Sequence, residues 1–391
     1  MLRENGQNRT GLIVAANACM FVFGVVLLLM GSLLPSLQVN YLQAGNLGSF
    51  PLAGILLATI LVGPILDRAG AKYVLALALA LIAVSLATMS LVHSYRPLAS
   101  AAFTYGMGGG LLNTATNALV SDLNFSGRAA ALNLLGFSFS LGAISAPLAM
   151  SVGGNWSPSL VLRLMAVLTG VVLVPVLLLR FPAATRTGTR IGTLLSVLKQ
   201  PTVWLFGVVL FFESGSENCM FVWSGKIVAD VLHTTPQRAN LALVGLSGAL
   251  GVGRLMAVFW LRRLGGRTTI LVSAATTVVG ALFVSTSHEF IPMIAGIMVI
   301  GLGLSSIFPT ALGLAGDCFP RETGTVFGAI MAVALVGGTA GPSVAAQLAS
   351  HSPNDVLWLP IISAVMVAVL TVLVGRLKCE WISKPVAHAE R

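Results

Sequence analysis

Apolar stretches of about 20 residues follow one another along the whole chain, separated by short joints of glycine, proline and charged residues. A helix of about 20 apolar residues crosses the hydrocarbon core of a bilayer, where its backbone polar groups must bond within the helix. The pattern predicts twelve such spans, and the chain is therefore expected to be an all-α membrane protein. The spans are expected at 11–37, 46–66, 72–93, 97–121, 128–152, 159–181, 202–225, 239–262, 268–287, 290–316, 324–349 and 355–376.

The composition excludes the soluble and the disordered classes of protein. Hydrophobic residues make up 56% of the chain, charged residues 9%, and the mean hydropathy is +0.94. Soluble domains carry about 25% charged residues, and disordered chains combine low hydrophobicity with high charge. The first apolar segment, 11–34, is longer than the apolar part of a signal peptide and further spans follow it. We expect it to stay in the protein.

The net charge of +10 does not indicate nucleic acid, because the lysines and arginines stand singly at the ends of apolar segments. The four cysteines show neither a disulfide framework nor a metal-ligand spacing, so we expect no metal and no cofactor. With both termini inside, 17 of the 22 lysines and arginines lie on the cytoplasmic side. The positive-inside rule then predicts a multi-pass protein with both termini cytoplasmic, in the cell membrane and specifically a bacterial inner membrane. We expect a monomer.

The two halves of the chain repeat each other at an offset of 195 residues. The matching positions are Gly106, Gly108 and Asp122 with Gly301, Gly303 and Asp317; Pro147 with Pro342; and Arg68, Gly70 and Lys72 with Arg263, Gly265 and Arg267. A duplicated six-span unit is the usual basis of alternating access, in which two bundles rock about a site between them. We expect a first bundle at 1–181, a cytoplasmic linker at 182–201 and a second bundle with a short tail at 202–391.

The segment GPILDRAGAK at 63–72 resembles the loop between the second and third spans of the major facilitator superfamily. The resemblance implies that Asp67 faces the amino end of the eleventh span, and that Arg68 and Lys72 surround the cytoplasmic gate. In the second half Arg262 stands at the place of Asp67, which departs from the pattern.

Three further segments are similar to the fucose–galactose–glucose:proton symporter branch of that superfamily. They are GLGLSSIFPTALGLAGD at 301–317, GAIMAVALVGGTAGP ending at Pro342, and ESGSENCMFVW at 213–223. The resemblance implies proton symport of a small polar solute such as a hexose. Two positions depart from the branch: Gly31 and Asn113 stand where fucose permeases carry the carboxylates that are linked to proton coupling.

Two carboxylates in the seventh span are the candidates for proton coupling. Glu213 lies near the middle of that span and Glu217 follows one helical turn later on the same face. Low dielectric and a like-charged neighbour both favour the neutral form of a carboxyl group. Either residue could therefore take up a proton near neutral pH, and Glu217 also belongs to the segment that resembles the branch. Sodium coupling stays open.

Amides and aromatic rings supply the other candidates for binding the solute. Amides donate and accept hydrogen bonds, as sugar hydroxyls require, and aromatic rings can stack on the apolar face of a sugar. The candidates are Asn17, Asn113, Asn117 and Asn133 among the amides and Phe137, Trp223 and Phe308 among the rings. Each could equally serve helix packing. For Arg254, in the eighth span, snorkelling to the interface is expected more than pairing with a carboxylate.

Two other functions are weighed against import of a polar solute. Proton-driven efflux of a drug or metabolite stays open, because GAISAP at 142–147 weakly resembles the antiporter motif of the superfamily. An intramembrane hydrolase is a remote alternative that rests on GLSG at 245–248. Its serine would need a histidine base at membrane depth, and all five histidines lie in loops, at span ends or in the tail.

Overall fold

The computed structural model describes residues 2–92, 94–123, 128–152, 156–181, 199–319 and 323–374, and every regular element within these ranges is a helix. The first half forms α1 (Leu2–Leu33), α2 (Tyr41–Ala69), α3 (Ala71–Met89), α4 (Tyr95–Leu123), α5 (Arg128–Val152) and α6 (Pro158–Leu178). The second half forms α8 (Pro201–Leu232), α10 (Leu241–Leu264), α11 (Gly266–Thr286), α12 (Phe290–Leu304), α13 (Ile307–Cys318), α14 (Thr323–Ala349) and α15 (Trp358–Val374). Short elements are η1 (Leu34–Ser36), α9 (Pro236–Ala239) and η2 (Pro353–Leu357).

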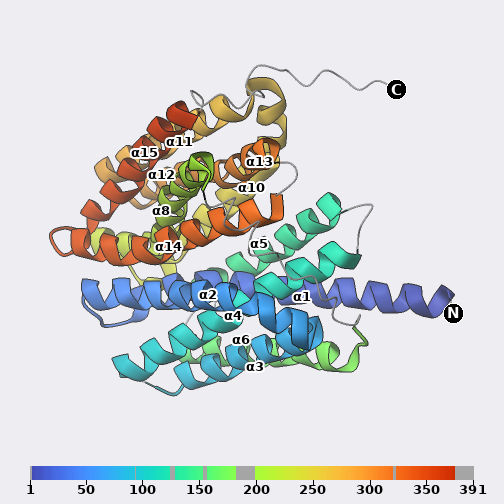
Figure 1. The fold of residues 1–391 in the computed structure, drawn as a ribbon. Helices are drawn as coiled ribbons and strands as arrows, with labels where there is room; N and C mark the ends of the chain where they lie inside the picture. The colour runs from blue at the N-terminus through green and yellow to red at the C-terminus, as the bar shows by residue number, and fades with distance from the viewer. Residues whose placement is uncertain are drawn as a thin grey trace.

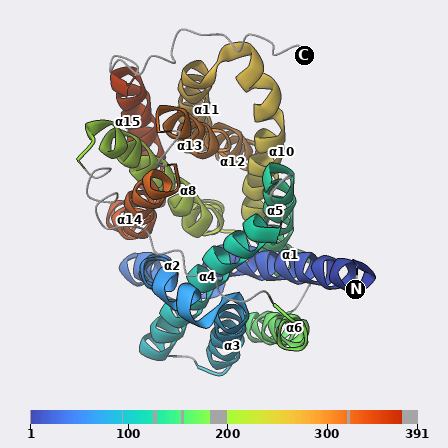
Figure 2. The same cartoon turned by 45° about the vertical axis from the view of Figure 1, so that its right-hand side comes forward.

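The helices form two bundles that follow the two halves of the sequence. Figure 1 shows α1–α6, in blue to green, below α8, in yellow-green, and α10–α15, in yellow to red, and the turned view in Figure 2 shows the same order, with α5 reaching up to α10. Helices α12 and α13 together make one span of the second bundle. The predicted fold of twelve transmembrane helices in two six-helix bundles is confirmed.

Among the described residues, eleven helical segments are long and apolar enough to cross a membrane. The twelfth span is α4, which packs between α1, α2 and α3. Its glycines at 106 and 108–110 and its two amides, Asn113 and Asn117, lower its hydropathy. Because α4 is surrounded by other helices, it needs less apolar surface than a helix that faces lipid.

The seventh and tenth spans are two of the elements that differ from the expected spans. The tenth span is not one helix, because α12 ends at Leu304 and α13 begins at Ile307. The seventh span, expected to end at residue 225, continues as α8 to Leu232. In this extension Lys226 and Asp230 form an ion pair at 3.2 Å, one helical turn apart, which supports the added turns.

The two bundles touch closely at one end of the helices, which we call the closed end; it contains the end of α1, the start of α2, the end of α8 and the start of α10. A Cβ atom on Gly31 of α1 would collide with the carbonyl oxygen of Phe221 in α8. A Cβ atom on Gly45 of α2 would collide with Ala346 of α14. Glycine at these positions lets the helices approach to backbone contact.

Polar contacts cross between the bundles at the same end. The Asn240 Nδ2 group at the start of α10 donates to the carbonyl oxygen of Ser32 in α1 at 3.0 Å. The hydroxyl oxygens of Ser49 in α2 and Ser343 in α14 lie 2.8 Å apart. The ring of Tyr41 lies under the Lys226 Nζ atom, 5.1 Å from the ring centre. Such bonds hold more firmly where water is excluded.

The distribution of buried apolar side chains agrees with contact between the bundles at one end only. At the closed end, side chains of the second bundle at 219–228 of α8 belong to the same apolar cluster as the first bundle. Nearer the other end, α8 contributes residues 203–210 to a separate cluster with α13, α14 and α15. There Ile60 of α2, Leu134 of α5 and Met256 of α10 are 61%, 51% and 43% exposed. The bundles therefore share a core at one end only.

A substitution at Gly31 should weaken the closed end. Gly31→Ala places a Cβ atom against backbone that cannot rotate away, and overpacking of this kind costs about 1–3 kcal/mol, or at least about fivefold in population. In a chain whose native cysteines are alanine, Ser49→Cys and Ser343→Cys should form a disulfide rapidly. The fraction cross-linked is measured on gels after cleavage at a protease site inserted within 182–198.

The Gly31→Ala change should slow this cross-linking at least about fivefold. Gly170→Ala is the matched control, because a Cβ atom at Gly170 meets nothing within 4 Å. Equal cross-linking rates in both variants would show that the Gly31 contact does not hold the closed end together.

Candidate functional site

A charged pair joins α8 and α10 in the interior of the second bundle. Glu217 lies midway along the 32-residue α8. The Arg254 Nη2 group of α10 donates to Glu217 Oε1 at 3.2 Å. The side chain of Glu217 is 12% exposed and that of Arg254 is 35% exposed. The side chain of Glu217 is thus largely enclosed, whereas that of Arg254 is partly exposed.

The position of this pair follows from the helix geometry. Glu217 lies 15 residues before the end of α8 at Leu232, and Arg254 lies 13 residues after the start of α10 at Leu241. Residues at similar distances from the connection of two antiparallel helices stand at similar levels, because each residue rises about 1.5 Å along its helix. The charged side chains therefore meet without a bend in either helix.

Glu213 lies one helical turn from Glu217 and is the most enclosed acidic side chain of the described residues, at 1% exposure. Its Oε2 atom accepts a bond from the Ser214 hydroxyl at 3.3 Å, while its Oε1 atom has no hydrogen-bond partner within the described part of the chain. The Glu213 carboxyl group is near enough to Glu217 and Arg254 to interact with both. We call Glu213, Glu217 and Arg254 the charged cluster.

Close helix packing positions the charged cluster. A Cβ atom on Gly337 of α14 would collide with the carbonyl oxygen of Phe211, and one on Gly341 would collide with that of Gly215. These glycines therefore bring α14 against the segment of α8 that carries the two glutamates. On the other side, a Cβ atom on Gly253 would collide with the hydroxyl of Ser305. The break between α12 and α13 therefore lies beside Gly253, the residue before Arg254.

The position of Arg254 differs from the expectation, and Arg254 was not among the predicted site residues. Snorkelling was expected, but the side chain pairs with Glu217 instead. The similar spacing of the two residues from the helix connection was the signal that could have predicted the pair. Asn218 was also missed: its Nδ2 group donates to the carbonyl oxygen of Ser214 at 2.9 Å, next to both glutamates.

The predicted amides lie in the first bundle. The Asn117 Nδ2 group donates to the backbone oxygen and to the side-chain oxygen of Asn113, both at 2.8 Å, so the structure brings these two side chains together. Asn17 accepts a bond from the Ser138 hydroxyl at 2.8 Å and thereby links α1 to α5. The side chain of Asn133 lies outside the described residues. A role in binding the solute stays a prediction for all four.

The three predicted aromatic residues have different surroundings. Trp223 is buried at the closed end, where its Nε1 group donates to the carbonyl oxygen of Pro342 at 3.1 Å and its ring contacts Tyr41. Phe137 on α5 is 58% exposed. Phe308 packs against the separate apolar cluster of the second bundle. Stacking of a solute on Trp223 would require the closed end to open.

Of the three predicted gate residues, Arg68 and Lys72 have described side chains, and that of Asp67 lies outside the described residues. Arg68 is exposed at the end of α2. The Lys72 Nζ group donates to the carbonyl oxygen of Leu179 at 3.0 Å, which follows α6. A cation is favourable at a helix C-terminus. This contact stays within the first bundle, and the gating role of the three residues stays a prediction.

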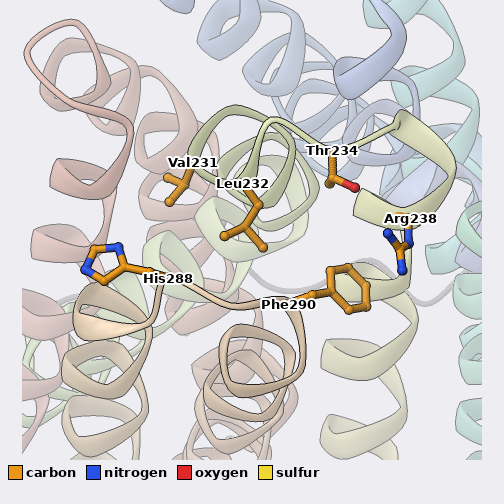
Figure 3. A pocket seen from close by; sticks show the side chains of 6 residues that line it. All are labelled: Val231, Leu232, Thr234, Arg238, His288 and Phe290. Carbon is orange, nitrogen blue, oxygen red and sulfur yellow. The ribbon is translucent and has the colours of Figure 1, made fainter.

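Two surface cavities of about 310 Å³ lie away from the charged cluster. Figure 3 shows the first, at the closed end of the second bundle, with Arg238 pointing to the ring of Phe290 and His288 on the far side. The Arg238 guanidinium lies 5.5 Å from that ring centre. On α8 the cavity begins at Val231, about 21 Å along the helix from Glu217. The second cavity lies between α3 and α4.

Comparison with known proteins identifies the kind of protein that carries this site. The chain is 26% identical to the uncharacterized transporter y4wD of Sinorhizobium fredii, over 89% of this chain and 87% of that protein. Its fold resembles the nucleoside transporter NupG, with a TM-score of 0.75, 15% identity and coverage of 94% of this chain and 98% of that one.

The fold also resembles a bacterial homolog of the human lysosomal transporter Spinster in an inward-facing, unoccupied conformation. The TM-score is 0.74 with 12% identity, over 95% of this chain and 97% of that one. These proteins are transporters and not enzymes, which sets the hydrolase alternative aside. The hexose:proton symporter branch stays a prediction. Because the Major Facilitator Superfamily profile matches residues 12–225 and 207–390, the chain belongs to the Major Facilitator Superfamily and is a transporter of that type.

Proposed function

We propose that the chain is a secondary transporter that moves a small polar solute by alternating access, coupled to protons through Glu217 and Glu213. The observation that carries the proposal is the ion pair of Glu217 with Arg254, beside the enclosed Glu213 carboxyl group. Ionisable residues within membrane spans are costly and usually mark substrate or ion pathways. The described α14 and α15, which pack on α8, contain no charged residue.

The charged cluster supports coupling to protons because its charges depend on one another. A carboxylate that loses its cation in an enclosed site is strongly destabilised. Any step that draws Arg254 away from Glu217 therefore favours the binding of a proton by Glu217 or Glu213. When the loss of the contact with Arg254 favours proton binding, the binding of the solute and the binding of the proton become coupled.

The one-sided contact of the bundles supports alternating access. If the termini are cytoplasmic, the closed end faces outward, and the end at which the bundles share no apolar core faces the cytoplasm. The bundles at 1–181 and 202–391 would then rock as two bodies joined by the linker at 182–201. The glycine contacts of Gly31 and Gly45 would separate in the outward-open state.

The solute is proposed to be small and polar, with a hexose as the class that the branch resemblance implies. The fold neighbour NupG is a nucleoside transporter, so nucleosides belong in the same assay. Sodium coupling is the rival to proton coupling, because carboxylates also bind sodium. The site does not indicate the direction of transport, which the experiment determines.

Purified protein in liposomes should accumulate at least one labelled solute when an inward pH gradient is applied. The panel holds glucose, galactose, fucose and uridine together with the sugar acid glucuronate. For one proton per solute and no charge movement, a gradient of one pH unit supports up to about tenfold accumulation. A sodium gradient alone should support none. If no solute responds to a pH gradient and an amphipathic compound is expelled instead, efflux replaces this proposal.

Glu217→Gln should abolish accumulation, leaving the inside-to-outside ratio of the solute near 1, because the amide cannot bind and release the coupling proton. Exchange of labelled for unlabelled solute should continue, since it needs no net proton movement. The matched control is Glu289→Gln, the same chemical change at an exposed carboxylate that precedes α12. Accumulation that survives in Glu217→Gln would contradict the assigned role.

A further inference from the structure

We infer that the solute is a small organic anion, whose carboxylate takes Arg254 away from Glu217 so that a proton binds the released glutamate. This inference rests on the proposed proton-coupled transport and names the class of solute. The side chain of Arg254 uses only part of its hydrogen-bonding capacity within the described structure and is partly exposed.

Arg254 has N–H donors that a second carboxylate could use. A guanidinium carries five N–H donors in a planar fork that matches the two oxygens of a carboxylate. The described structure gives Arg254 one such bond, from Nη2 to Glu217 Oε1 at 3.2 Å. Its side chain is 35% exposed, against 12% for its partner. An incoming anion therefore finds donors that a neutral solute would use far less well.

A solute carboxylate would make the stronger pair. Two parallel bonds to a guanidinium are stronger and more directional than the single bond that Glu217 makes. A neutral sugar or nucleoside offers hydroxyl and amide groups, which leave the charges of the pair unchanged. Neutral solutes would thus bind beside the ion pair, whereas anions compete for it.

The displaced Glu217 then needs a proton. It is 12% exposed, and its neighbour on the same face is Glu213, which is buried and has an unbonded oxygen within the described part of the chain. A carboxylate left there without Arg254 would be an enclosed charge next to a second carboxyl group. Binding a proton to Glu217 removes this charge. Release of the anion reverses the exchange: Glu217 gives up its proton and pairs with Arg254 again.

The described elements packed against α8 offer no other cation at the level of Glu217. Their other described ionisable side chains lie toward the helix ends or are thiols: Lys226, Asp230, Arg238 and Asp355 at the closed end, Arg9 and Arg263 toward the other end, the fully buried Cys19 and Cys219, and Cys318 at the end of α13. Four more, Arg3, Glu4, Arg262 and Asp317, stand near the ends of their helices, and their side chains lie outside the described residues. Helices α12, α14 and α15 carry no ionisable side chain. Arg254 is therefore the cation for which Glu217 and the solute compete.

The exchange conserves charge. Before binding, the positive Arg254 balances the negative Glu217; afterwards Arg254 balances the anion and Glu217 is neutral. One monoanion and one proton cross together, so transport is electroneutral. A neutral solute that moved with a proton would instead carry one positive charge. The response to membrane potential therefore separates the two classes of solute.

The test compares D-glucuronate with its neutral counterpart D-glucose in proteoliposomes. Gluconate and lactate extend the acids, and galactose and uridine extend the neutral solutes. One arm applies a pH gradient at zero potential, and the other applies a potassium diffusion potential with valinomycin at equal pH. We expect at least one acid to accumulate under the pH gradient, with uptake that changes less than about twofold when the potential is applied.

Three variants connect the result to the charged cluster. Arg254→Gln should raise the KM for the acid about 10- to 100-fold, the usual effect of losing charged hydrogen bonds. Arg254→Lys keeps the charge without the fork and should give an intermediate KM. In Glu217→Gln the KM should stay low, because residue 217 no longer competes for Arg254. The matched control Arg238→Gln, a cation in α9 at the closed end, should leave the KM unchanged.

Binding by purified variants, measured as a ligand-induced shift in Tm, keeps the test valid if one variant transports poorly. The inference is overturned if a neutral solute accumulates with charge movement and no acid does, or if Arg254→Gln binds the acid as wild type does. In both cases proton-coupled transport survives. If neither acids nor neutral solutes respond to the pH gradient, the proposed function itself fails.

Discussion

The ion pair between Glu217 and Arg254 is the interaction on which the site depends. Each side chain alone would be an unpaired charge in the interior of a membrane protein, where the penalty is several kcal/mol. Paired across two antiparallel helices, they hold α8 and α10 at one level. Glu213, one turn away, makes the pair sensitive to any change in charge, because its carboxyl group is near enough to interact with both Glu217 and Arg254.

The second constraint is the contact of the two bundles at one end. Glycines at 31 and 45 allow backbone contact there, and Asn240, Ser49 and Tyr41 add polar and aromatic contacts. The same helix α8 carries both the charged cluster and the closed-end residues Phe221, Trp223 and Lys226. A change at the cluster can therefore reach the closed end through one rigid helix, over about two turns.

Much of the fold was predictable from the sequence, because bilayer thickness sets the length of each apolar segment. The two-bundle arrangement followed from the repeat at an offset of 195 residues. The break at Ser305 and Ser306 was not predictable from hydropathy, since both serines lie in an otherwise apolar segment. The extension of α8 to Leu232 depends on packing at the closed end, which periodicity does not report.

The site was predictable in part. The depth of Glu213 and Glu217 was visible in the sequence, and so was the shared face of Asn113 and Asn117. The partner of Asn17, Ser138, is 121 residues away and is known only from the packing of α1 on α5. The pairing of Arg254 could have been predicted from its spacing, but the choice between pairing and snorkelling depends on which way the side chain faces. Only the packed structure shows which way the side chain of Arg254 faces.

The most direct test of the account is thermal unfolding of Glu217→Gln, Arg254→Gln and the double variant in detergent at pH 8. We expect Arg254→Gln to lower Tm by several degrees, because it leaves the enclosed carboxylate unpaired. We expect Glu217→Gln to lower it by less, because the arginine that it leaves unpaired is more exposed. The double variant should recover most of the loss, since neither charge is stranded, while it transports nothing. If the two single losses simply add in the double variant, the pair is not an interacting unit and the account is wrong.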